Sequence, residues 1–512
     1  MSSTITVFLL YFIVIIGVTL YVSVRMFKTK KANFSSEYFV GGRRIGPLAL
    51  AILIAAGVAS TGTFIGGPGL SGENGFGFAM LFGFGQLIMN LFVLGIVGKK
   101  INIISRRINA QSYLDLFYYR FAAYKPLIIL LLLALLTFLI TAASAEFIGG
   151  SRVIQSMTGI PFSYSLIGFG IIIVAYTALG GLRGVTTVAM MQGIIMTLAS
   201  VILIVAFIIH FGGVTPIFEA SAELDPVRAS PGGTEPLYTM VDFWFTYGIG
   251  VLGLAWGVQG ALSYRSVKTM KTAIVFGIIM VTFWTVFMSM GGVAGKVLFP
   301  DLASSDLLIP NLAEEVLPGT LSGFVLAAVA GAGQSTIGAL FILASSSIVV
   351  TAYKLLKDSQ KNENHQRSQK SVRMASIIVT ICVGVLVVAL AFNPPDTLQD
   401  FITLSQGGSA AALAPTLILG LYWPRMNKYG ALAGILFGFA SYFIIGSVEF
   451  GAEWLAHFPL ILSAPIAFLA AISVSYLTPL SSRPIIEAFF GSHTPSGRWL
   501  VEEGNIKASE SE

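Results

Sequence analysis

Three residues in an apolar stretch of the second half of the chain could bind a hard cation. Ala332, Ser335 and Thr336 stand at positions i, i+3 and i+4, so a helix would bring them to one face. Two hydroxyl oxygens and a backbone carbonyl form half of a cage for a cation that prefers oxygen ligands. The alternative is structural, because Ser and Thr in membrane helices also bond to a carbonyl on the preceding turn of their own helix.

A second stretch, residues 47–70, could complete such a cage. Glycine and hydroxyl residues, among them Ser60 and Thr63, are concentrated through its middle, so the segment can unwind. In a bilayer an unwound backbone is tolerated only where it is buried in protein or lines a cavity, since freed carbonyls need partners. Those carbonyls can then bind a cation or a solute. The alternative is that the small residues serve close helix packing.

Glu146 is the acidic residue that lies well within an apolar stretch. A charged carboxylate in lipid costs several kcal/mol or more, so it must be protonated, paired or in a wet cavity. Recognition of an ammonium-bearing solute and participation in proton coupling are two functional hypotheses. A structural hydrogen bond near the outer boundary of the membrane is the alternative.

The elements that position these residues are membrane helices. Of the 512 residues, 55% are hydrophobic and 11% are charged, and the mean hydropathy is +0.84, whereas about a quarter of the residues of a soluble domain are charged. Apolar runs of the roughly 20 residues that cross a hydrocarbon core recur along the chain. We predict about thirteen spans, at residues 5–27, 47–70, 77–98, 125–150, 162–181, 186–210, 241–264, 272–297, 320–354, 374–393, 399–422, 429–447 and 458–478.

The distribution of basic residues predicts the orientation of these spans. With the N-terminus outside, all but three of the 30 Lys and Arg residues fall in cytoplasmic loops or in the tail. The exceptions are Arg152, Arg228 and Lys296. A miscounted span would scramble this division. The chain is therefore predicted to be a multi-pass protein of the inner (plasma) membrane, with its N-terminus outside and its C-terminus cytoplasmic.

Several other classes of protein are disfavoured by composition. The net charge of +6 follows from the same loop bias, and the basic residues form no patch for nucleic acid. The single Cys382 lies inside a predicted span, and the four His residues lack metal-ligand spacing. The sequence shows no Ser-His-Asp constellation, no phosphate loop and no folded cytoplasmic domain, so we do not expect an enzyme. No obligate protein partner is evident.

Five motifs together give the chain a family resemblance. They are Tyr38–Arg43, Thr63–Gly69, Gly149–Val153, Ala178–Arg183 leading to Gln192, and Gly420–Gly434. The last is the most specific, because its Trp, two bases and Gly-Ala-x-x-Gly fall at a characteristic spacing. From about Ser35 to Gly438 the chain resembles the sodium:solute symporter family, which includes sodium-coupled carriers of proline, pantothenate, galactose and sialic acid.

The resemblance implies an all-α fold with a five-plus-five inverted repeat of the leucine-transporter type and extra flanking helices. The expected divisions are an extra N-terminal helix and cytoplasmic loop at 1–46, a first repeat half at 47–210, an external loop at 211–240, a second half at 241–422, two additional helices at 423–478 and a cytoplasmic tail at 479–512. The broken helix at 47–70 would pair with a glycine-rich counterpart at 241–264.

The resemblance also implies a sodium site. Its ligands would be the backbone carbonyls of Ala56, Ala59 and Ala332 and the hydroxyls of Ser335 and Thr336. Releasing sodium to the inside would loosen the contact between the broken helix and the span at 320–354, and so favour inward opening.

A second sodium is not expected. Family members with a second site place an Asp where this chain has Ala189, and the hydroxyls expected one turn past Ser335 are replaced by Gly338 and Ala339. We therefore expect one sodium per solute.

Candidate solute contacts lie beside the broken helices, where the family has its substrate pocket. They are Ser60, Thr63, Glu146, Trp256, Gln259 and Gln406. For each of them, packing or a hydrogen bond within the helix is an alternative role.

The predicted function is sodium-coupled symport of a small organic solute, such as an amino acid or an organic acid, by alternating access. The alternative is a membrane sensor of the same fold that acts with a separate signalling partner. The predicted partners are the solute, sodium and the lipid bilayer.

Overall fold

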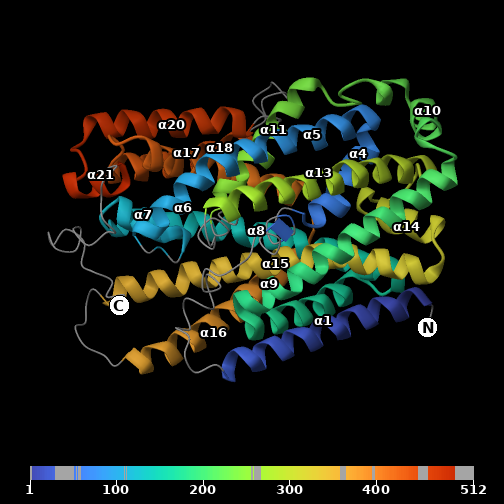
Figure 1. Cartoon of the computed structure of the whole chain (residues 1–512). Helices are drawn as coiled ribbons and strands as arrows, with labels where there is room; N and C mark the ends of the chain where they lie inside the picture. Colours follow the sequence, from blue (N-terminus) through green and yellow to red (C-terminus); the bar gives the residue numbers. More distant parts are fainter. Residues whose placement is uncertain are drawn as a thin grey trace.

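The computed structural model is helical almost throughout the residues that it describes (Figure 1). These are residues 3–28, 51–52, 55, 59–108, 110, 112–254, 258, 267–357, 365–394, 398–447 and 459–490. The longer elements are α1 (Ser3–Lys28), α5 (Phe76–Phe92), α8 (Lys125–Thr158), α9 (Phe162–Phe211), α11 (Leu237–Gly253), α13 (Val267–Leu298), α15 (Gly319–Lys357), α16 (His365–Ala391), α17 (Leu398–Tyr422), α18 (Lys428–Ser447) and α20 (Pro459–Leu477). The shorter ones are η2 (Gly62–Gly66), α4 (Gly67–Asn74), η3 (Val93–Val97), α6 (Gly98–Arg107), α7 (Tyr113–Arg120), α10 (Val214–Leu224), η4 (Pro226–Ala229), η5 (Ser305–Leu307), α14 (Leu308–Val316) and α21 (Arg483–Phe490).

Most of the long helices are apolar enough to cross a membrane. In the described part of the chain, 8 segments meet this condition by length and composition. Three shorter apolar segments, Ser3–Thr19, Phe76–Gly85 and Phe162–Ala178, fall on further predicted spans. The prediction of an all-helical polytopic protein is confirmed, and the number of thirteen spans stays a prediction.

Helix α9 differs from the expected boundaries. The sequence predicted two spans, at 162–181 and 186–210, with Arg183 in a connecting loop. The backbone is instead helical over all 50 residues of α9, and a straight helix of that length would measure about 75 Å, against a hydrocarbon core of about 30 Å. Its two apolar parts remain distinct, as Phe162–Ala178 and Thr187–Phe211, so the connection between them is helical rather than irregular.

The glycine-rich stretch at 47–70 is interrupted at Ala59 and Ser60. The backbone is helical at residues 51, 52 and 55, non-helical at 59 and 60, and helical again from Thr61. The π-helical turn η2 follows and continues into α4. Gly75 ends α4 with a φ of 102°, which residues with a side chain rarely adopt. The predicted unwinding is therefore present at these two residues.

Helix α15 runs through the centre of the protein. Inside it, 94% of the most apolar window is buried by other parts of the chain. It packs against α1, α8 and α9 and also touches η2. Its small residues allow these neighbours to approach closely: a Cβ added at Gly323 would lie 2.4 Å from the Thr4 carbonyl oxygen. The helix that carries the predicted hydroxyl ligands is thus the innermost element.

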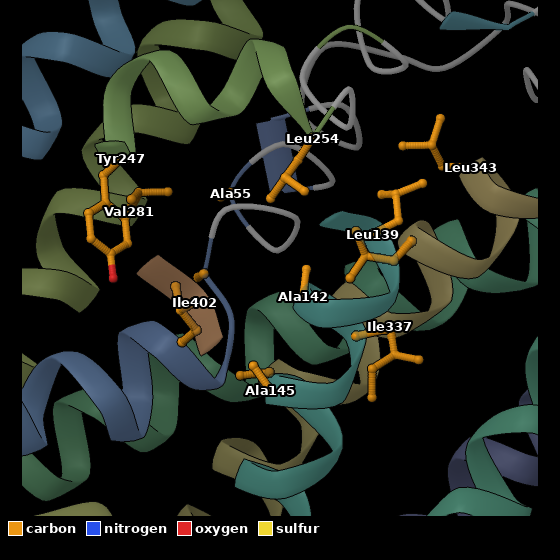
Figure 2. Packing of buried hydrophobic residues seen from close by; sticks show 14 of the residues in the cluster. Ala55, Leu139, Ala142, Ala145, Tyr247, Leu254, Val281, Ile337, Leu343 and Ile402 are labelled. Carbon is orange, nitrogen blue, oxygen red and sulfur yellow. The ribbon is translucent and has the colours of Figure 1, made fainter. Parts of the chain in front are cut away.

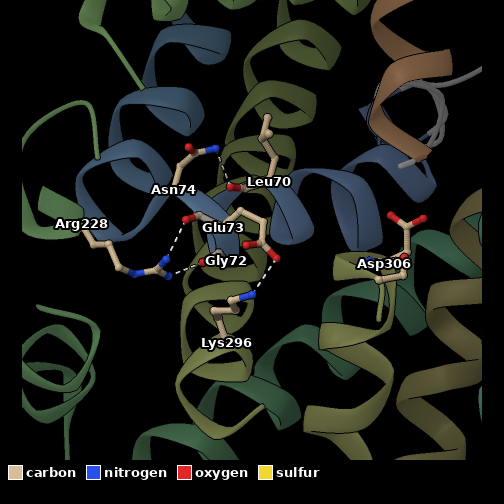
Figure 3. Close-up of polar contacts among 8 residues, drawn as sticks. Leu70, Gly72, Glu73, Asn74, Arg228, Lys296 and Asp306 are labelled. Carbon is tan, nitrogen blue, oxygen red and sulfur yellow. Dashed lines mark hydrogen bonds and ion pairs between the residues drawn. The ribbon is translucent and has the colours of Figure 1, made fainter. Parts of the chain in front are cut away.

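Basic residues separate toward two ends of the molecule. At one end Arg120 is buried and donates to the carbonyls of Gly420 (2.8 Å) and Met426 (2.9 Å), which holds α7 against the connection between α17 and α18. Arg228 and Lys296 lie at the other end, near α4 and α10 (Figures 1 and 3). This separation agrees with the predicted division of charge. Which end faces the cytoplasm stays a prediction.

Candidate sodium and solute site

The carboxylate of Glu146 binds the start of the second half of the interrupted helix. The backbone N–H of Thr61 and its Oγ1 hydroxyl both donate to Glu146 Oε2, each at 2.8 Å. Glu146 is 4% exposed and Thr61 is fully buried. The first N–H groups of a helix have no partner within it, and its N-terminus favours negative charge, so Glu146 acts as the cap that this helix start lacks.

Two glycines allow Thr61 to sit between α8 and α15. A Cβ added at Gly149 of α8 would lie 2.6 Å from Thr61 Cβ, and one added at Gly333 of α15 would lie 2.6 Å from Thr61 Cγ2. The same atom at Gly333 would lie 3.2 Å from the carbonyl oxygen of Glu146. The interrupted helix, α8 and α15 therefore meet at one point, where any side chain would clash.

The predicted sodium ligands of α15 are buried beside this point. Ser335 Oγ donates to the Ala332 carbonyl at 2.8 Å, and Thr336 Oγ1 donates to it at 3.2 Å. This is the bond to the preceding turn that the sequence left as the alternative. It is compatible with cation binding, because a hydroxyl that donates its proton keeps oxygen lone pairs for a cation.

The Ala59 carbonyl is released from the usual helical pattern. The Thr63 N–H, which would reach Ala59 in a regular helix, donates instead to the Ser60 carbonyl at 2.9 Å. Ala59 is fully buried. Its oxygen and those of Ala332, Ser335 and Thr336 are the donors that a sodium ion prefers, so the described residues fit the ion. Ala56 lies outside the described residues.

The predicted solute contacts are placed unevenly. Ser60 and Thr63 are 8% and 7% exposed and lie at or just after the interruption, close in the chain to Thr61. Gln406 of α17 packs at the contact with α11, where a Cβ added at Gly250 would lie 3.0 Å from Gln406 Cβ. Trp256 and Gln259 lie outside the described residues. The structure thus places Ser60 and Thr63 in the chain close to Thr61, which binds Glu146, and places Gln406 at the contact of α11 with α17.

Two buried polar residues near the interruption were missed by sequence reasoning. Gln399 of α17 donates through Nε2 to Tyr247 Oη of α11 and to Thr403 Oγ1 (3.2 Å). Among the described residues its amide oxygen has no hydrogen-bond partner, and it would lie 2.9 Å from a Cβ at Gly66 of η2. The signal for Gln399 was a lone amide at the start of an apolar span.

Apolar side chains surround this polar point. Figure 2 shows Ala142 and Ala145 of α8, Ile337 of α15 and Ile402 of α17 around the interrupted helix. On the side of α13, the rings of Phe64 and Trp284 lie 6.1 Å apart. Apolar side chains therefore lie around this point, and a buried polar group among them must be paired or must bind something.

Charged residues hold the second half of the interrupted helix, α4, in place. The guanidinium of Arg228 donates to the carbonyls of Gly72 and Glu73 at the C-terminal end of α4, where a cation is favoured (Figure 3). Lys296 of α13 forms an ion pair with Glu73 at 3.0 Å. The half-helix that Glu146 caps at one end is thus capped by a base at the other.

A buried carboxylate lies nearby, in the connection after α13. Asp306 in η5 is 2% exposed, and its Oδ2 accepts the N–H of Leu398, the first residue of α17, at 3.2 Å. Burial, with a smaller contribution from the charge of Asp400, raises the pKa of Asp306 from 3.8 to about 6. The Leu398 bond and the charge of Arg152 oppose this rise.

The geometry and the solved structures that resemble it define a class of protein. A Na+-coupled sialic acid symporter in a substrate-bound outward-open state gives a TM-score of 0.76 at 18% identity, covering 94% of this chain and 99% of that one. Mhp1, a nucleobase-cation-symport-1 family transporter, gives 0.56 at 13% identity, covering 88% and 97%. MhsT, in complex with L-phenylalanine, gives 0.52 at 14% identity, covering 84% and 98%. The fold is that of the leucine-transporter type, as predicted.

Sequence comparison gives the family. The profile of the sodium:solute symporter family matches residues 38–438. The sodium/pantothenate symporter of Escherichia coli (strain K12) is 32% identical over 463 residues, 90% of this chain and 93% of that protein. That of Haemophilus influenzae is 33% identical over 422 residues, 82% and 86% of the two chains. The sodium/proline symporter 2 of Staphylococcus saprophyticus is 26% identical over 442 residues, 84% of each. The chain belongs to the sodium:solute symporter family.

Membership confirms the predicted function at the level of its class. The protein is a multi-pass membrane transporter, not an enzyme, and it couples the movement of a small organic solute to sodium. The relatives named here are carriers, so the sensor alternative gains no support.

Substitutions at Glu146 test its role as a cap. Glu146→Gln keeps an oxygen that accepts both Thr61 bonds, so we expect initial uptake rates within about threefold of wild type. Glu146→Leu leaves two buried donors without a partner, at a cost of about 1–3 kcal/mol each, and we expect uptake to fall more than tenfold. Uptake is measured per amount of protein in the membrane, with exposed Glu315→Leu as control. Equal loss in the Gln and Leu variants would show that the charge is required.

Asp306 gives a prediction for pH. Because its pKa is higher in the folded protein than in the unfolded chain, its contribution to stability is present below the unfolded value and is lost as pH rises through about 6. Asp306→Asn keeps an acceptor for Leu398 without the charge. We expect its melting temperature to exceed that of wild type at pH 7.5 and the difference to shrink toward pH 5. Exposed Asp301→Asn is the control, and a lower melting temperature of Asp306→Asn at pH 7.5 would contradict the prediction.

Proposed function

We propose that the solute is an organic acid of the pantothenate class, a small carboxylate with hydroxyl and amide groups and no amine. The observation that carries this proposal is the pairing of Glu146 with Thr61. Because Oε2 of this carboxylate already accepts two bonds from a helix start, the acid is less available to a solute ammonium group than an unpaired one. Two relatives that are 32% and 33% identical to this chain are named sodium/pantothenate symporters, which supports the same choice.

The other buried carboxylate of a described span is engaged in the same way. Asp242 of α11 accepts the N–H of Ile461, near the start of α20, and the hydroxyl of Thr246, both at 3.3 Å. Each of these two acids therefore serves a helix end or a hydroxyl of the protein itself. This arrangement favours a solute without a positive charge over an amino acid.

The hydroxyl and amide groups of such a solute have suitable partners near the interruption. Ser60 and Thr63 supply hydroxyls, and the amide oxygen of Gln399 supplies an acceptor that the protein leaves unpaired. The apolar surroundings suit the dimethyl carbon of pantothenate. We assign these three residues as the polar contacts, with Tyr247 orienting Gln399. Gln406, Trp256 and Gln259 remain candidate contacts.

We further propose that sodium binds between the interruption and α15, at Ala56, Ala59, Ala332, Ser335 and Thr336, with one ion per solute. The released Ala59 carbonyl and the paired hydroxyls of α15 support this site. A solute with one negative charge and one Na+ together carry no net charge. Transport would then be electroneutral. The two repeat halves, 47–210 and 241–422, would move relative to each other so that the site opens to one side of the membrane at a time. The N-terminus would lie outside.

Uptake into proteoliposomes tests the solute and the stoichiometry together. We expect an inward sodium gradient to drive accumulation of labelled pantothenate and not of proline. The Hill coefficient for sodium should be close to 1, and an imposed potassium diffusion potential should not change the rate. Accumulation of proline instead would overturn the solute class. A Hill coefficient near 2, or a rate that rises with a negative interior, would overturn the stoichiometry.

A further inference from the structure

A buried tyrosine of α1, Tyr11, forms a hydrogen bond with α15. Tyr11 Oη donates to Gln334 Oε1 at 3.3 Å, and Gln192 Nε2 of α9 donates to Tyr11 Oη and to Gln334 Oε1, each at 2.9 Å. Their exposed fractions are 9% for Tyr11, 1% for Gln192 and 0% for Gln334. These three residues, from three helices, form a closed polar cluster that we call the Tyr11 cluster.

The Tyr11 cluster contacts α15 directly next to the proposed sodium ligands. Gln334 directly precedes Ser335, and its backbone carbonyl also accepts a bond from Tyr176 Oη of α9 at 2.7 Å. A Cβ added at Gly331 would lie 2.4 Å from Tyr11 Oη, and one added at Gly338 would lie 2.5 Å from Tyr176 Oη. Both tyrosine hydroxyls therefore sit directly on the backbone of α15, where glycines leave them room.

Other contacts fix the position of Tyr11 along α15. A Cβ added at Gly319 would lie 2.5 Å from Ser3 Oγ, so the start of α1 touches the start of α15. Further along α1, the ring of Phe12 meets Phe169 of α9 edge-on, with centroids 6.3 Å apart. The first helix cannot slide without breaking these contacts. Tyr11 is thus held from both sides.

The cluster and the sodium ligands lie on different faces of one helix. At about 100° per residue, Ala332, Ser335 and Thr336 lie roughly 100–200° around α15 from Gln334. A rotation of α15 would move the two hydroxyls and break the bonds of Gln334 together. The network on one face therefore sets where the ligands point on the other.

We propose that Tyr11 is a positioning residue for sodium binding: through Gln192 and Gln334 it fixes the rotation of α15 and so places the oxygens of Ser335 and Thr336. The proposal rests on the proposed sodium site. Loss of the Tyr11 hydroxyl removes two of the three bonds of the cluster and leaves Gln192 and Gln334 joined only to each other, so α1 no longer holds the rotation of α15.

Sodium activation of Tyr11→Phe tests the proposal, because this change removes the hydroxyl and keeps the ring. We expect the half-saturating sodium concentration for uptake to rise at least fivefold, with the maximal rate within twofold of wild type. Tyr21→Phe, on the same helix and with Tyr21 65% exposed, should behave as wild type. A purely structural role would lower the amount of folded protein and the maximal rate at an unchanged half-saturating concentration, and that result would overturn the proposal.

Two further variants keep the outcomes separable. Tyr176→Phe removes the hydrogen bond from Tyr176 Oη to the Gln334 backbone carbonyl and should raise the half-saturating sodium concentration in the same way. This variant tests the proposal if Tyr11→Phe fails to fold. Ser335→Ala removes a proposed ligand. If it leaves sodium activation unchanged, the proposed site is wrong. If it raises the half-saturating concentration while Tyr11→Phe and Tyr176→Phe do not, only the positioning role is overturned.

Discussion

A helix that is interrupted inside a membrane must find partners for the backbone groups that the interruption frees, and the structure depends on how Glu146 meets this requirement. Water is absent, so an unpaired N–H or carbonyl costs several kcal/mol. Glu146 accepts the N–H and the hydroxyl of Thr61 and so caps the helix that restarts there. A carboxylate that would be costly alone in hydrocarbon becomes tolerable, because the start of a helix provides donors and a favourable dipole.

The cap has consequences for both ligands. Because Glu146 is already bonded to Thr61, it is less available to a solute ammonium group. The proposed solute contacts are then hydroxyl and amide groups, such as Ser60 and the amide oxygen of Gln399, which has no partner among the described residues. The cap also holds Thr61, two residues after the non-helical Ala59, between Gly149 of α8 and Gly333 of the helix that carries Ser335 and Thr336. On the far face of that helix, Tyr11 and Tyr176 fix its backbone. The proposed sodium ligands are therefore positioned by groups outside the proposed site.

Patterns that depend on composition along the chain could be predicted from the sequence, and contacts between distant segments could not. Glycine and hydroxyl content located the interruption, and the spacing of Ala332, Ser335 and Thr336 placed them on one face. The sequence marked Glu146 as costly, but only the fold shows that its partner is Thr61, 85 residues away. Gln399 and Tyr247 were missed because a lone polar residue at the end of a span has no periodic signal. The helical connection within α9 was missed because its glycines and Arg183 favour a loop locally.

Direct binding of radioactive sodium to the purified protein, without solute, tests most directly whether the interruption and α15 together form a single ion site. We predict one saturable class of site with about one Na+ per chain, and loss of most of this binding in Thr336→Ala. Ser346→Ala, which removes another buried hydroxyl of the same helix, should keep it. Two ions per chain, or undiminished binding in Thr336→Ala, would contradict a single sodium site between the interruption and α15.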